Sequence, residues 1–288
     1  MKIARLCPAC NSEKLKKKSA VLMPFIADRV FGWEPMVINE ELGFKTLDLG
    51  TSYSVCNSCF CEKCRFLFSD IRFDEDEVIN LYNDYRGDQY TKLREKYEPG
   101  YESHNKYLSN EIHYISDIES YILSHIDTPK IMLDWGGDEG VNTPFKEMET
   151  IIDIYDVSNK KVNSSSKRFN FVNSTHNLLG KYDLLIAMHV FEHLSYPIES
   201  LKDILNFLRP GGVIYIEVPL EKIINFKDPQ VDVLNKKRHW HEHINFYNYY
   251  SLEALAKQAN LNIIDISDFD ASDNYREFKI QRLLASKD

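Results

Sequence analysis

Six cysteines form three C-x-x-C pairs within the first 64 residues: Cys7 and Cys10, Cys56 and Cys59, and Cys61 and Cys64. A C-x-x-C turn presents two thiolates to one tetrahedral metal ion, and two such turns complete a closed zinc site. We favour the first and third pairs as ligands, because Cys64 runs directly into the apolar stretch Arg65–Phe68, as the second knuckle of a zinc ribbon does. Cys56 and Cys59 are the alternative second pair.

The expected metal is a structural Zn²⁺ ion. All six cysteines lie in a chain that we expect to be cytoplasmic, where disulfides rarely persist. A redox role for a C-x-x-C pair needs a thioredoxin-like βαβ context, which the surrounding sequence lacks. A site closed by four thiolates has no open position for catalysis, so the ion is expected to replace the missing core of a small N-terminal module.

A glycine-rich turn, Trp135-Gly136-Gly137-Asp138-Glu139-Gly140, follows a buried strand predicted at 130–134. Glycines at such a turn let the backbone approach a ligand where a Cβ would collide. The two acids of the turn would repel a pyrophosphate, whereas they are compatible with a zwitterionic amino-acid end and a sulfonium cation. Asp156 lies 20 residues after Gly136, where a carboxylate at the end of a strand can bind ribose hydroxyls.

Histidines gather in two places along the chain. His189 and His193 flank Glu192 in the stretch MHVFEHL. The second group alternates, so an extended backbone would put its members on one face: His239, His241 and His243. A histidine titrates near neutrality and can remove a proton from a hydroxyl or an acidic carbon. Both groups therefore contain candidate proton acceptors.

From residue 129 onward the periodicity predicts an α/β fold. Further strands are expected at 148–156, 169–172, 182–188 and 212–218, and an amphipathic helix at 198–208 that Pro210 ends. Strands that alternate with helices predict a Rossmann-like, doubly wound parallel sheet, which binds ligands at the carboxyl ends of its strands.

The preceding segment is predicted to be helical, with a helix at 74–85 and a long helical run at 104–126. We therefore expect a zinc-ribbon-like module at 1–73, a helical linker or lid at 74–128 and the Rossmann-like domain at 129–288. Basic and aromatic residues in the lid either close over the cleft to contact an acceptor or form an exposed helix face: Arg86, Tyr90, Arg94, Tyr97 and Tyr101.

The segments LDWGGDEG, YDVS, YDLLIAMHVFEHL and LNFLRPGGVIYIEVP resemble successive motifs of the class I S-adenosylmethionine-dependent methyltransferases, over roughly residues 130–285. The family pattern D-x-G-x-G-x-G becomes D-x-G-G-D-E-G here, with Asp138 at the middle glycine. The resemblance implies that Asp156 binds the ribose and that Met188 and His189 lie beside the sulfonium. It also implies that the methionine part is bound by Asp134, Gly136, Gly137 and Gly140.

The N-terminal C-x-x-C-Arg-Phe-Leu-Phe and the later Trp240-His241-Glu242-His243 are similar to a subgroup that includes bacterial deoxysugar C-methyltransferases and relatives in surface-polysaccharide and natural-product pathways. This resemblance implies a catalytic Glu242 and His243, with His243 as general base. The implied acceptor is a nucleotide-linked sugar or a surface-glycan precursor. The longer sugar C-methyltransferases carry a further C-terminal domain, which these 288 residues have no room for.

A second resemblance concerns His189, Glu192 and His193. Their H-x-x-E-H pattern resembles the E-x-x-E-H metal set of ubiquinone-pathway O-methyltransferases and small-RNA terminal methyltransferases. It implies a catalytic Mg²⁺ or Mn²⁺ that assists hydroxyl deprotonation, which we consider less favoured than simple base catalysis.

Composition limits the remaining function classes. With 43% hydrophobic residues the chain can bury a core, and its formal net charge of −9 disfavours a general nucleic-acid binder. No apolar run approaches the ~18 residues of a membrane span. The start lacks the apolar stretch of a secretory signal, so we expect a cytoplasmic protein. The alternative to an enzyme is a noncatalytic zinc-ribbon adaptor on a degenerate methyltransferase domain, binding a protein or nucleic-acid partner.

Overall fold

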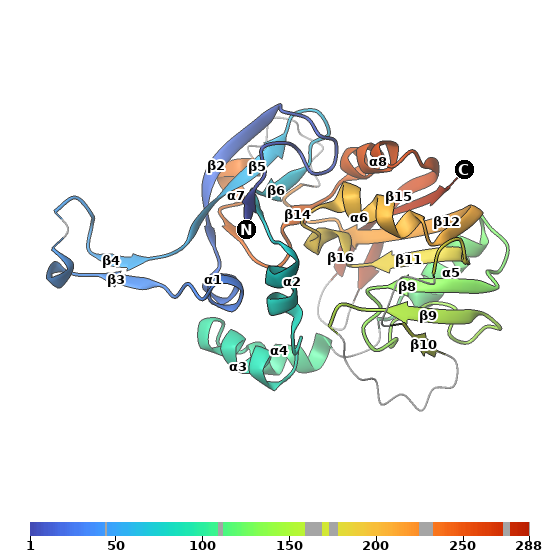
Figure 1. Ribbon diagram of the computed structural model, residues 1–288, viewed down its shortest axis with the longest axis horizontal. Helices are drawn as coiled ribbons and strands as arrows, with labels where there is room; N and C mark the ends of the chain where they lie inside the picture. Colours follow the sequence, from blue (N-terminus) through green and yellow to red (C-terminus); the bar gives the residue numbers. More distant parts are fainter. Residues whose placement is uncertain are drawn as a thin grey trace.

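The computed structural model describes residues 1–43, 45–108, 112–158, 169–172, 178–224, 233–272 and 277–287. Two sheets dominate the fold, one of seven strands and one of five, and they lie next to each other with the helices α2 (Glu75–Tyr82), α3 (Asp88–Tyr97) and α4 (Tyr101–Leu108) along one side (Figure 1). Among the described residues, no helix has the length and apolar character that a membrane crossing requires.

The seven-stranded sheet has the order β10-β9-β8-β11-β12-β16-β15. Its first five strands are parallel, and the last two are antiparallel to their neighbours. The α/β fold predicted from periodicity is confirmed. The strands are β8 (Ile131–Trp135), β9 (Ile151–Tyr155), β10 (Phe169–Phe171), β11 (Tyr182–Met188), β12 (Leu208–Pro219), β15 (Asn262–Ser272) and β16 (Glu277–Ser286).

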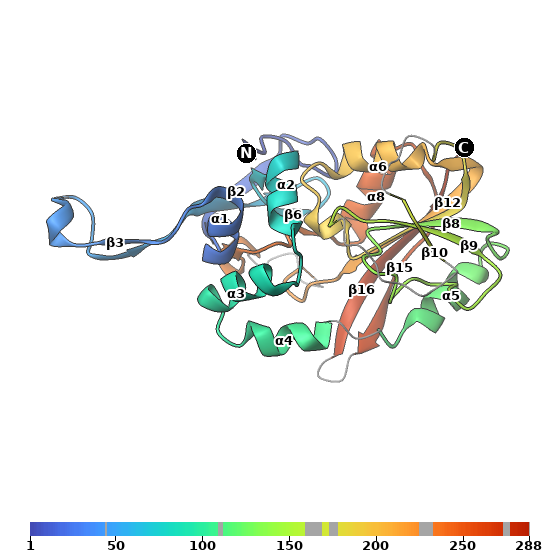
Figure 2. The same cartoon turned by 60° about the horizontal axis from the view of Figure 1, so that its bottom comes forward.

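Both faces of this sheet are covered, which explains why its strands are almost continuously apolar. Leu185 of β11 packs into a core with α6 (Pro197–Leu205) and α8 (Tyr249–Gln258), whereas the next residue, Ile186, packs into the opposite core with α5 (Ile115–Leu123). Figure 2 shows α6 and α8 on one side of the sheet and α5 on the other. The sheet is therefore doubly wound, as expected.

The five-stranded sheet combines distant parts of the chain. Its order is β13-β2-β5-β6-β14. Residues 239–246 thus contribute both edge strands to a sheet whose other strands lie before residue 70, so the predicted 1–73 module includes only part of this sheet. The strands are β2 (Leu15–Leu22), β5 (Val55–Cys61), β6 (Leu67–Ser69), β13 (His239–Trp240) and β14 (Asn245–Phe246).

Smaller elements complete the described chain. A short ladder joins β1 (Lys2–Ile3) to β7 (Ile71–Arg72), and α1 (Pro24–Phe31) follows β2. A hairpin of β3 (Met36–Ile38) and β4 (Gly50–Ser52) extends away from both sheets (Figure 1). The remaining elements are η1 (Glu40–Leu42), η2 (Phe191–His193) and α7 (Val233–Lys236).

Helix α2 begins as predicted, because Asp74 accepts the N–H of Glu77 and the Glu77 side chain accepts the N–H of Asp74. The single helical run predicted at 104–126 was wrong, since α4 ends at Leu108 and α5 begins only at Ile115. The side chain of Tyr107, which was counted in that run, lies outside the described residues. Between the helices Tyr114 turns inward, and its hydroxyl contacts the edge of the sheet.

Two other boundaries differ from the prediction. The helix expected at 198–208 ends at Leu205, and β12 already starts at Leu208, so Pro210 lies within the strand and does not end the helix. The pairing of β11 with β12 shifts register here, which accommodates a residue that cannot donate a ladder hydrogen bond. The strand expected at 148–156 begins at Ile151.

Candidate active site

A large cleft of about 2710 Å³ opens at the carboxyl ends of β8, β9, β11 and β12. The glycine-rich turn, Asp156 and His189 line its sheet side, and Tyr82, Arg86 and Arg94 of the helical segment line the opposite side. His193 and His243 also line it. The sheet edge, the lid and the histidines thus share one cavity, as the doubly wound fold predicts.

The glycine turn after β8 has no room for side chains at its glycines. Gly136 has a φ of +88°, and a Cβ there would lie 2.5 Å from Val190. A Cβ on Gly137 would lie 2.6 Å from a carboxylate oxygen of Asp134. Asp138, which stands at the middle glycine of the family pattern, adopts a φ of +47°. This is a left-handed conformation that Asp tolerates better than most residues. The turn therefore keeps a tight backbone despite the missing glycine.

Two carboxylates flank the turn. Asp134 is buried and accepts the hydroxyl of Thr143, and its burial raises its pKa to about 6, against the opposing effect of that hydrogen bond. Asp156 accepts the backbone N–H of Asp138 at 3.0 Å and of Ser158 at 2.8 Å, which fixes its side chain at the end of β9. A carboxylate held in this way retains lone pairs for two neighbouring hydroxyls.

His189 follows β11 and is held between two buried acids. Its Nε2 lies 2.9 Å from the Tyr114 hydroxyl and 3.2 Å from Glu217, and its Nδ1 lies 3.5 Å from Glu192. Burial would lower its pKa, but the two carboxylates outweigh burial and raise it to about 10. A histidine that stays protonated at neutral pH cannot accept a proton. His189 was predicted as a candidate base, and this environment favours a fixed cation instead.

A second group lies deeper toward the N-terminal sheet. The rings of His193 and His243 are 4.6 Å apart and nearly perpendicular. His193 Nδ1 lies 3.2 Å from the carbonyl oxygen of Glu242, so we place the proton there, which leaves Nε2 as an acceptor. Burial and the neighbouring His243 lower the pKa of His193 to about 4. Potential ligand atoms of Glu192, His193 and His243 lie within 4.8 Å of one another. The structure thus gathers His243, and not His189, with the two residues of the predicted H-x-x-E-H set.

His243 itself has a raised pKa. Burial would lower it, but Glu221, whose carboxylate lies 4.0 Å from Nδ1, and the charges of Glu192 and Glu242 raise it above its ordinary value. The side chain is partly exposed to the cleft. His243 therefore faces the cleft, and its surroundings raise its pKa above the ordinary 6.5 of histidine.

Glu242 points away from this pair, into the lid. Its carboxylate accepts the Tyr90 hydroxyl at 2.9 Å and Arg94 Nη1 at 3.2 Å. Burial would raise the pKa of Glu242, but His241 and Arg94 lower it to about 2. Glu242 thus remains charged, and its ion pair with Arg94 connects α3 to the segment that contains His243.

The predicted lid residues have three different environments. Arg86 and Arg94 line the cleft, whereas Tyr90 and Tyr101 are buried in a core with Phe25 and Trp240. Tyr97 donates its hydroxyl to Asp28, outside the cleft. The segment is consequently neither an exposed helix face nor wholly a ligand-binding surface.

The three alternating histidines do not share a face. The strand that contains His239 ends at Trp240, and the chain then turns. His239 is exposed, His241 contacts Glu98, and only His243 reaches the cleft. The extended backbone that would place all three on one face is not present over 239–243, because the pairing of β13 with β2 stops after two residues.

Several residues in or beside the cleft were missed by the sequence reasoning. Tyr114 and Glu217 hold His189, Glu221 contacts His243, and the ring of Tyr82 lies edge-on to His193. The sequence pattern placed Tyr82 in a helix and Glu217 in a strand. Their partners lie far away in the chain, so the local sequence does not predict these contacts. Only the position of Glu217 near the end of β12 pointed toward the ligand edge.

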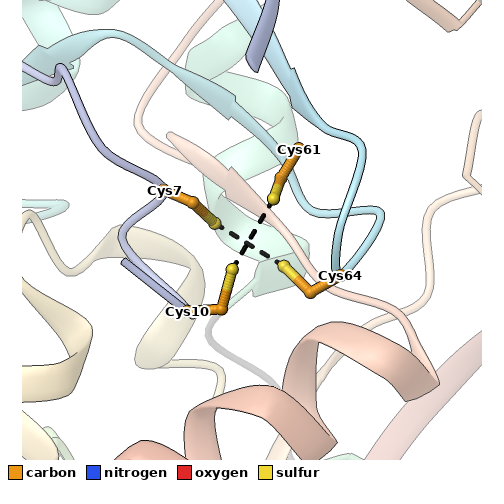
Figure 3. A group of neighbouring side chains, drawn as sticks. All are labelled: Cys7, Cys10, Cys61 and Cys64. Carbon is orange, nitrogen blue, oxygen red and sulfur yellow. Dashed lines mark hydrogen bonds between the residues drawn. The ribbon is translucent and has the colours of Figure 1, made fainter. Parts of the chain in front are cut away.

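The four predicted zinc ligands come together, and their sulfurs point toward a common centre (Figure 3). The sulfurs of Cys7 and Cys64 are 3.6 Å apart, as are those of Cys10 and Cys61. Four thiolates around a tetrahedral zinc would be separated by about 3.8 Å, and a disulfide would need about 2 Å. All four side chains are buried. The donor set therefore fits Zn²⁺. Cys56 and Cys59 lie on β5 outside this group.

The chain was compared with known proteins. A family model described as a methyltransferase domain matches residues 105–266, more than half of the chain. A 1,6-didemethyltoxoflavin-N1-methyltransferase from Burkholderia thailandensis, solved with 1,6-didemethyltoxoflavin and S-adenosylhomocysteine, matches with a TM-score of 0.52 and 14% identity, over 88% of this chain and 99% of that one. A SAM-dependent methyltransferase from Aquifex aeolicus matches with a TM-score of 0.42 and 15% identity, over 59% and 89% of the two chains. A search of curated proteins finds no match.

The Burkholderia structure supports the fold, and the family match covers β8 to β12 together with the glycine turn, His193 and His243. This assignment favours an enzyme over a noncatalytic adaptor. The chain belongs to the methyltransferase-domain family and is an S-adenosylmethionine-dependent methyltransferase.

Proposed function

We propose that this methyltransferase acts on a small polar acceptor, a nucleotide-linked sugar or surface-glycan precursor, with His243 as the general base. The observation that carries the proposal is the shared cleft. It is lined by the glycine turn, by the His193–His243 pair and by residues of the helical segment such as Arg86. A methyl donor and an acceptor can lie side by side in it, and such positioning supplies much of the rate of a transfer reaction.

S-adenosylmethionine supplies the transferable methyl group when it is bound. Its methionine part would lie against the turn of Gly136, Gly137 and Gly140, whose tight backbone has no room for a Cβ beside Val190, Asp134 and Ile154. Asp156 would bind the ribose hydroxyls. The backbone of Met188 and His189 ends β11 at the middle of this edge, where the sulfonium is expected.

The charges around His189 are also compatible with the sulfonium cation. Glu192 and Glu217 balance the protonated His189, so this side of the cleft is not net positive. A sulfonium can therefore approach without meeting an unbalanced cation. His189 serves here as a fixed element of the cofactor site and not as the base.

His243 is the better candidate for proton removal. Both His243 and Glu242 line the cleft, but the carboxylate of Glu242 already accepts hydrogen bonds from Tyr90 and Arg94. Its raised pKa favours uptake of a proton from an acceptor hydroxyl or acidic carbon as the methyl group arrives. The neutral His193 packs against it and orients its ring.

Four residues that line the cleft support this acceptor class. Arg86 and Lys222 are cations that can pair with phosphate oxygens, and Tyr82 and Tyr85 offer faces for a sugar ring. The four-cysteine site is proposed to bind a structural Zn²⁺ ion. It stabilises the sheet whose edge strands flank the segment that carries His243.

The test is transfer of a deuterated methyl group from S-adenosylmethionine to a pool of nucleotide sugars, followed by mass spectrometry. We expect one acceptor to gain the mass of one labelled methyl group, and the Gly136→Ala variant to give less product when S-adenosylmethionine is limiting. If the wild-type protein binds S-adenosylhomocysteine but labels no nucleotide sugar or glycan precursor, the proposed acceptor class is wrong.

A further inference from the structure

Glu192 is a buried carboxylate at the wall of the cleft. Only 2% of the residue is exposed, yet it lines the cavity. Neither of its oxygens accepts a hydrogen bond within the described chain. The cation beside it, His189, has its Nδ1 3.5 Å from Oε1, whereas a charge-assisted hydrogen bond measures about 2.7–2.9 Å. Buried carboxylates normally accept several hydrogen bonds, so Glu192 has lone pairs for donors that a bound molecule brings.

His193 presents a second acceptor at the same place. Its Nδ1 lies 3.2 Å from the carbonyl oxygen of Glu242, and a carbonyl only accepts, so Nδ1 carries the proton and Nε2 has a lone pair. The low pKa of His193, which burial and the neighbouring His243 cause, keeps the ring neutral. Nε2 lies 4.0 Å from Oε1 of Glu192. Two acceptors thus lie side by side without a proton to share.

The short helix η2, which carries both acceptors, is fixed by hydrogen bonds at its two ends. Asn245 Nδ2 donates to the carbonyl oxygen of Phe191 at 3.0 Å and to that of Leu194 at 2.7 Å. Asn245 in turn accepts Arg72 Nη1 at 2.7 Å, and both of these side chains are buried. The backbone therefore holds the two acceptors in place, and the donors that they lack have to come from a ligand.

His243 completes the group. Potential ligand atoms of Glu192, His193 and His243 lie within 4.8 Å of one another. When His243 is deprotonated, it too accepts a proton or a hydrogen bond. The group lies next to His189, which follows β11, where the sulfonium is expected. A reacting atom at this point is therefore surrounded by acceptors.

The number of donors on the reacting group decides which chemistry fits such a site. A hydroxyl offers one O–H donor, and a ketone or its acidic carbon offers no comparable donor. A primary amine offers two N–H donors and keeps a lone pair for attack. Water also carries two donors, so a group that displaces water from between Glu192 and His193 loses affinity unless it brings two as well. The primary amine meets this count.

We propose that the atom methylated in this cleft is the nitrogen of a primary amine, whose two N–H groups donate to Glu192 and His193. This inference rests on the proposed function and narrows its acceptor to an amino sugar on a nucleotide or glycan precursor. A hydroxyl in the same position would leave one of the two buried acceptors unpaired, and a site of this kind discriminates strongly against such an analogue.

His243 keeps the role of base in this reaction. The amine enters as an ammonium ion and gives one proton to neutral His243, which frees its lone pair. The nitrogen then forms a bond to the methyl carbon while the carbon–sulfur bond breaks, and that electron pair stays on sulfur. The product is a secondary ammonium ion whose charge Glu192 offsets, and His243 returns its proton to solvent.

The experiment uses the full-length, zinc-loaded protein, S-adenosylmethionine with a methyl group labelled for carbon NMR, and nucleotide sugars that carry a ring amino group together with their hydroxyl counterparts. The NMR spectrum distinguishes N-methyl, O-methyl and C-methyl products. We expect the label on nitrogen, with kcat/KM for the amine about 10²-fold or more above that of its hydroxyl counterpart. Label on oxygen or carbon overturns this inference and leaves the proposed acceptor class standing. If the protein binds S-adenosylhomocysteine but labels none of these compounds, both fail.

Glu192→Gln tests the residue itself, because it replaces one acceptor oxygen by an N–H donor with little change of shape. We expect KM for the amine to rise by about tenfold or more, while S-adenosylhomocysteine still binds. The matched control is Glu199→Gln, an exposed acid that also lines the cleft, and its KM should match the wild type. A wild-type KM in Glu192→Gln overturns the inference. If that variant does not fold, the position of the label on the wild-type product decides.

A divalent ion is the other occupant that three such side chains can bind. Transfer that requires added magnesium or manganese would mean that an ion, and not the amine, occupies these lone pairs, and it would overturn the inference. We expect the rate of transfer to the amine to be the same with and without either ion.

Discussion

Arg94 and Glu242 form an ion pair across the cleft, with Nη1 of the arginine 3.2 Å from Oε1 of the glutamate. The pair joins α3 to the residue that precedes His243, although 148 positions separate the two in the sequence. Only 13% of each side chain is exposed. Arg94 also lies 4.0 Å above the ring of Tyr101, so one guanidinium organises both the lid and the histidine segment.

Replacing Glu242 with Ala should therefore destabilise the protein. The change leaves Arg94 and the Tyr90 hydroxyl without their buried partner, which costs about 2–4 kcal/mol. Chemical unfolding measures the loss. The control is Lys257→Ala, which removes an exposed i,i+4 pair with Glu253 and should cost about 0.5 kcal/mol or less. Equal effects of the two substitutions would show that the Arg94–Glu242 pair does not fasten the lid.

The Glu221 carboxylate should set the pH dependence of the reaction. A general base works in its deprotonated form, and His243 has a pKa above 6.5, so kcat/KM should rise with pH through a midpoint above that value. Glu221→Gln removes a group that raises the pKa, so the midpoint should move to lower pH. The profile is measured with saturating S-adenosylmethionine in the presence and absence of a magnesium chelator. A midpoint that stays in place in the variant contradicts the role given to Glu221.

Gly136 provides a test of the cofactor turn. Gly136→Ala adds a Cβ that would lie 2.5 Å from Val190, so the turn must shift, and affinity for S-adenosylhomocysteine should fall by roughly tenfold or more. Calorimetry measures this affinity. Gly180→Ala is a matched control, because Gly180 also has a positive φ, +65°, but its Cβ would meet nothing within 4 Å. If both variants bind as the wild type does, the cofactor does not depend on this turn.

Metal content distinguishes the two candidate cysteine pairs. We expect one zinc ion per chain by elemental analysis, its loss in Cys64→Ser, and its retention in Cys56→Ser. The zinc-free variant should also unfold at a lower temperature, because metal binding and folding of such small modules are coupled. Retention of zinc by Cys64→Ser would place the ion elsewhere.

Many strands of the seven-stranded sheet could be predicted from the sequence, because the patterns that indicate them are local. The strand predicted at 182–188 has these bounds in the structure, since both of its faces are apolar and the charged or polar residues on either side end it. The four cysteines that the spacing favoured are the four that gather, because the apolar run after Cys64 continues directly into β6.

The remaining features depend on partners far away in the chain. His189 is held by Tyr114 and Glu217, 75 and 28 residues distant, and nothing in the local sequence predicts those contacts. An extended backbone would have placed the three late histidines on one face, but β13 pairs with an N-terminal strand for two residues only. Pro210 suggested the end of a helix, whereas an irregular strand accommodates it.

The most direct test of the proposed mechanism is the rate of methyl transfer by His243→Ala, compared with His239→Ala, an exposed histidine outside the cleft. With the acceptor identified in the labelling experiment and both variants shown to bind S-adenosylhomocysteine, we expect His243→Ala to be slower by about 10²–10⁴-fold. His239→Ala should match the wild type. Transfer by His243→Ala at the wild-type rate would contradict the proposal that His243 is the base.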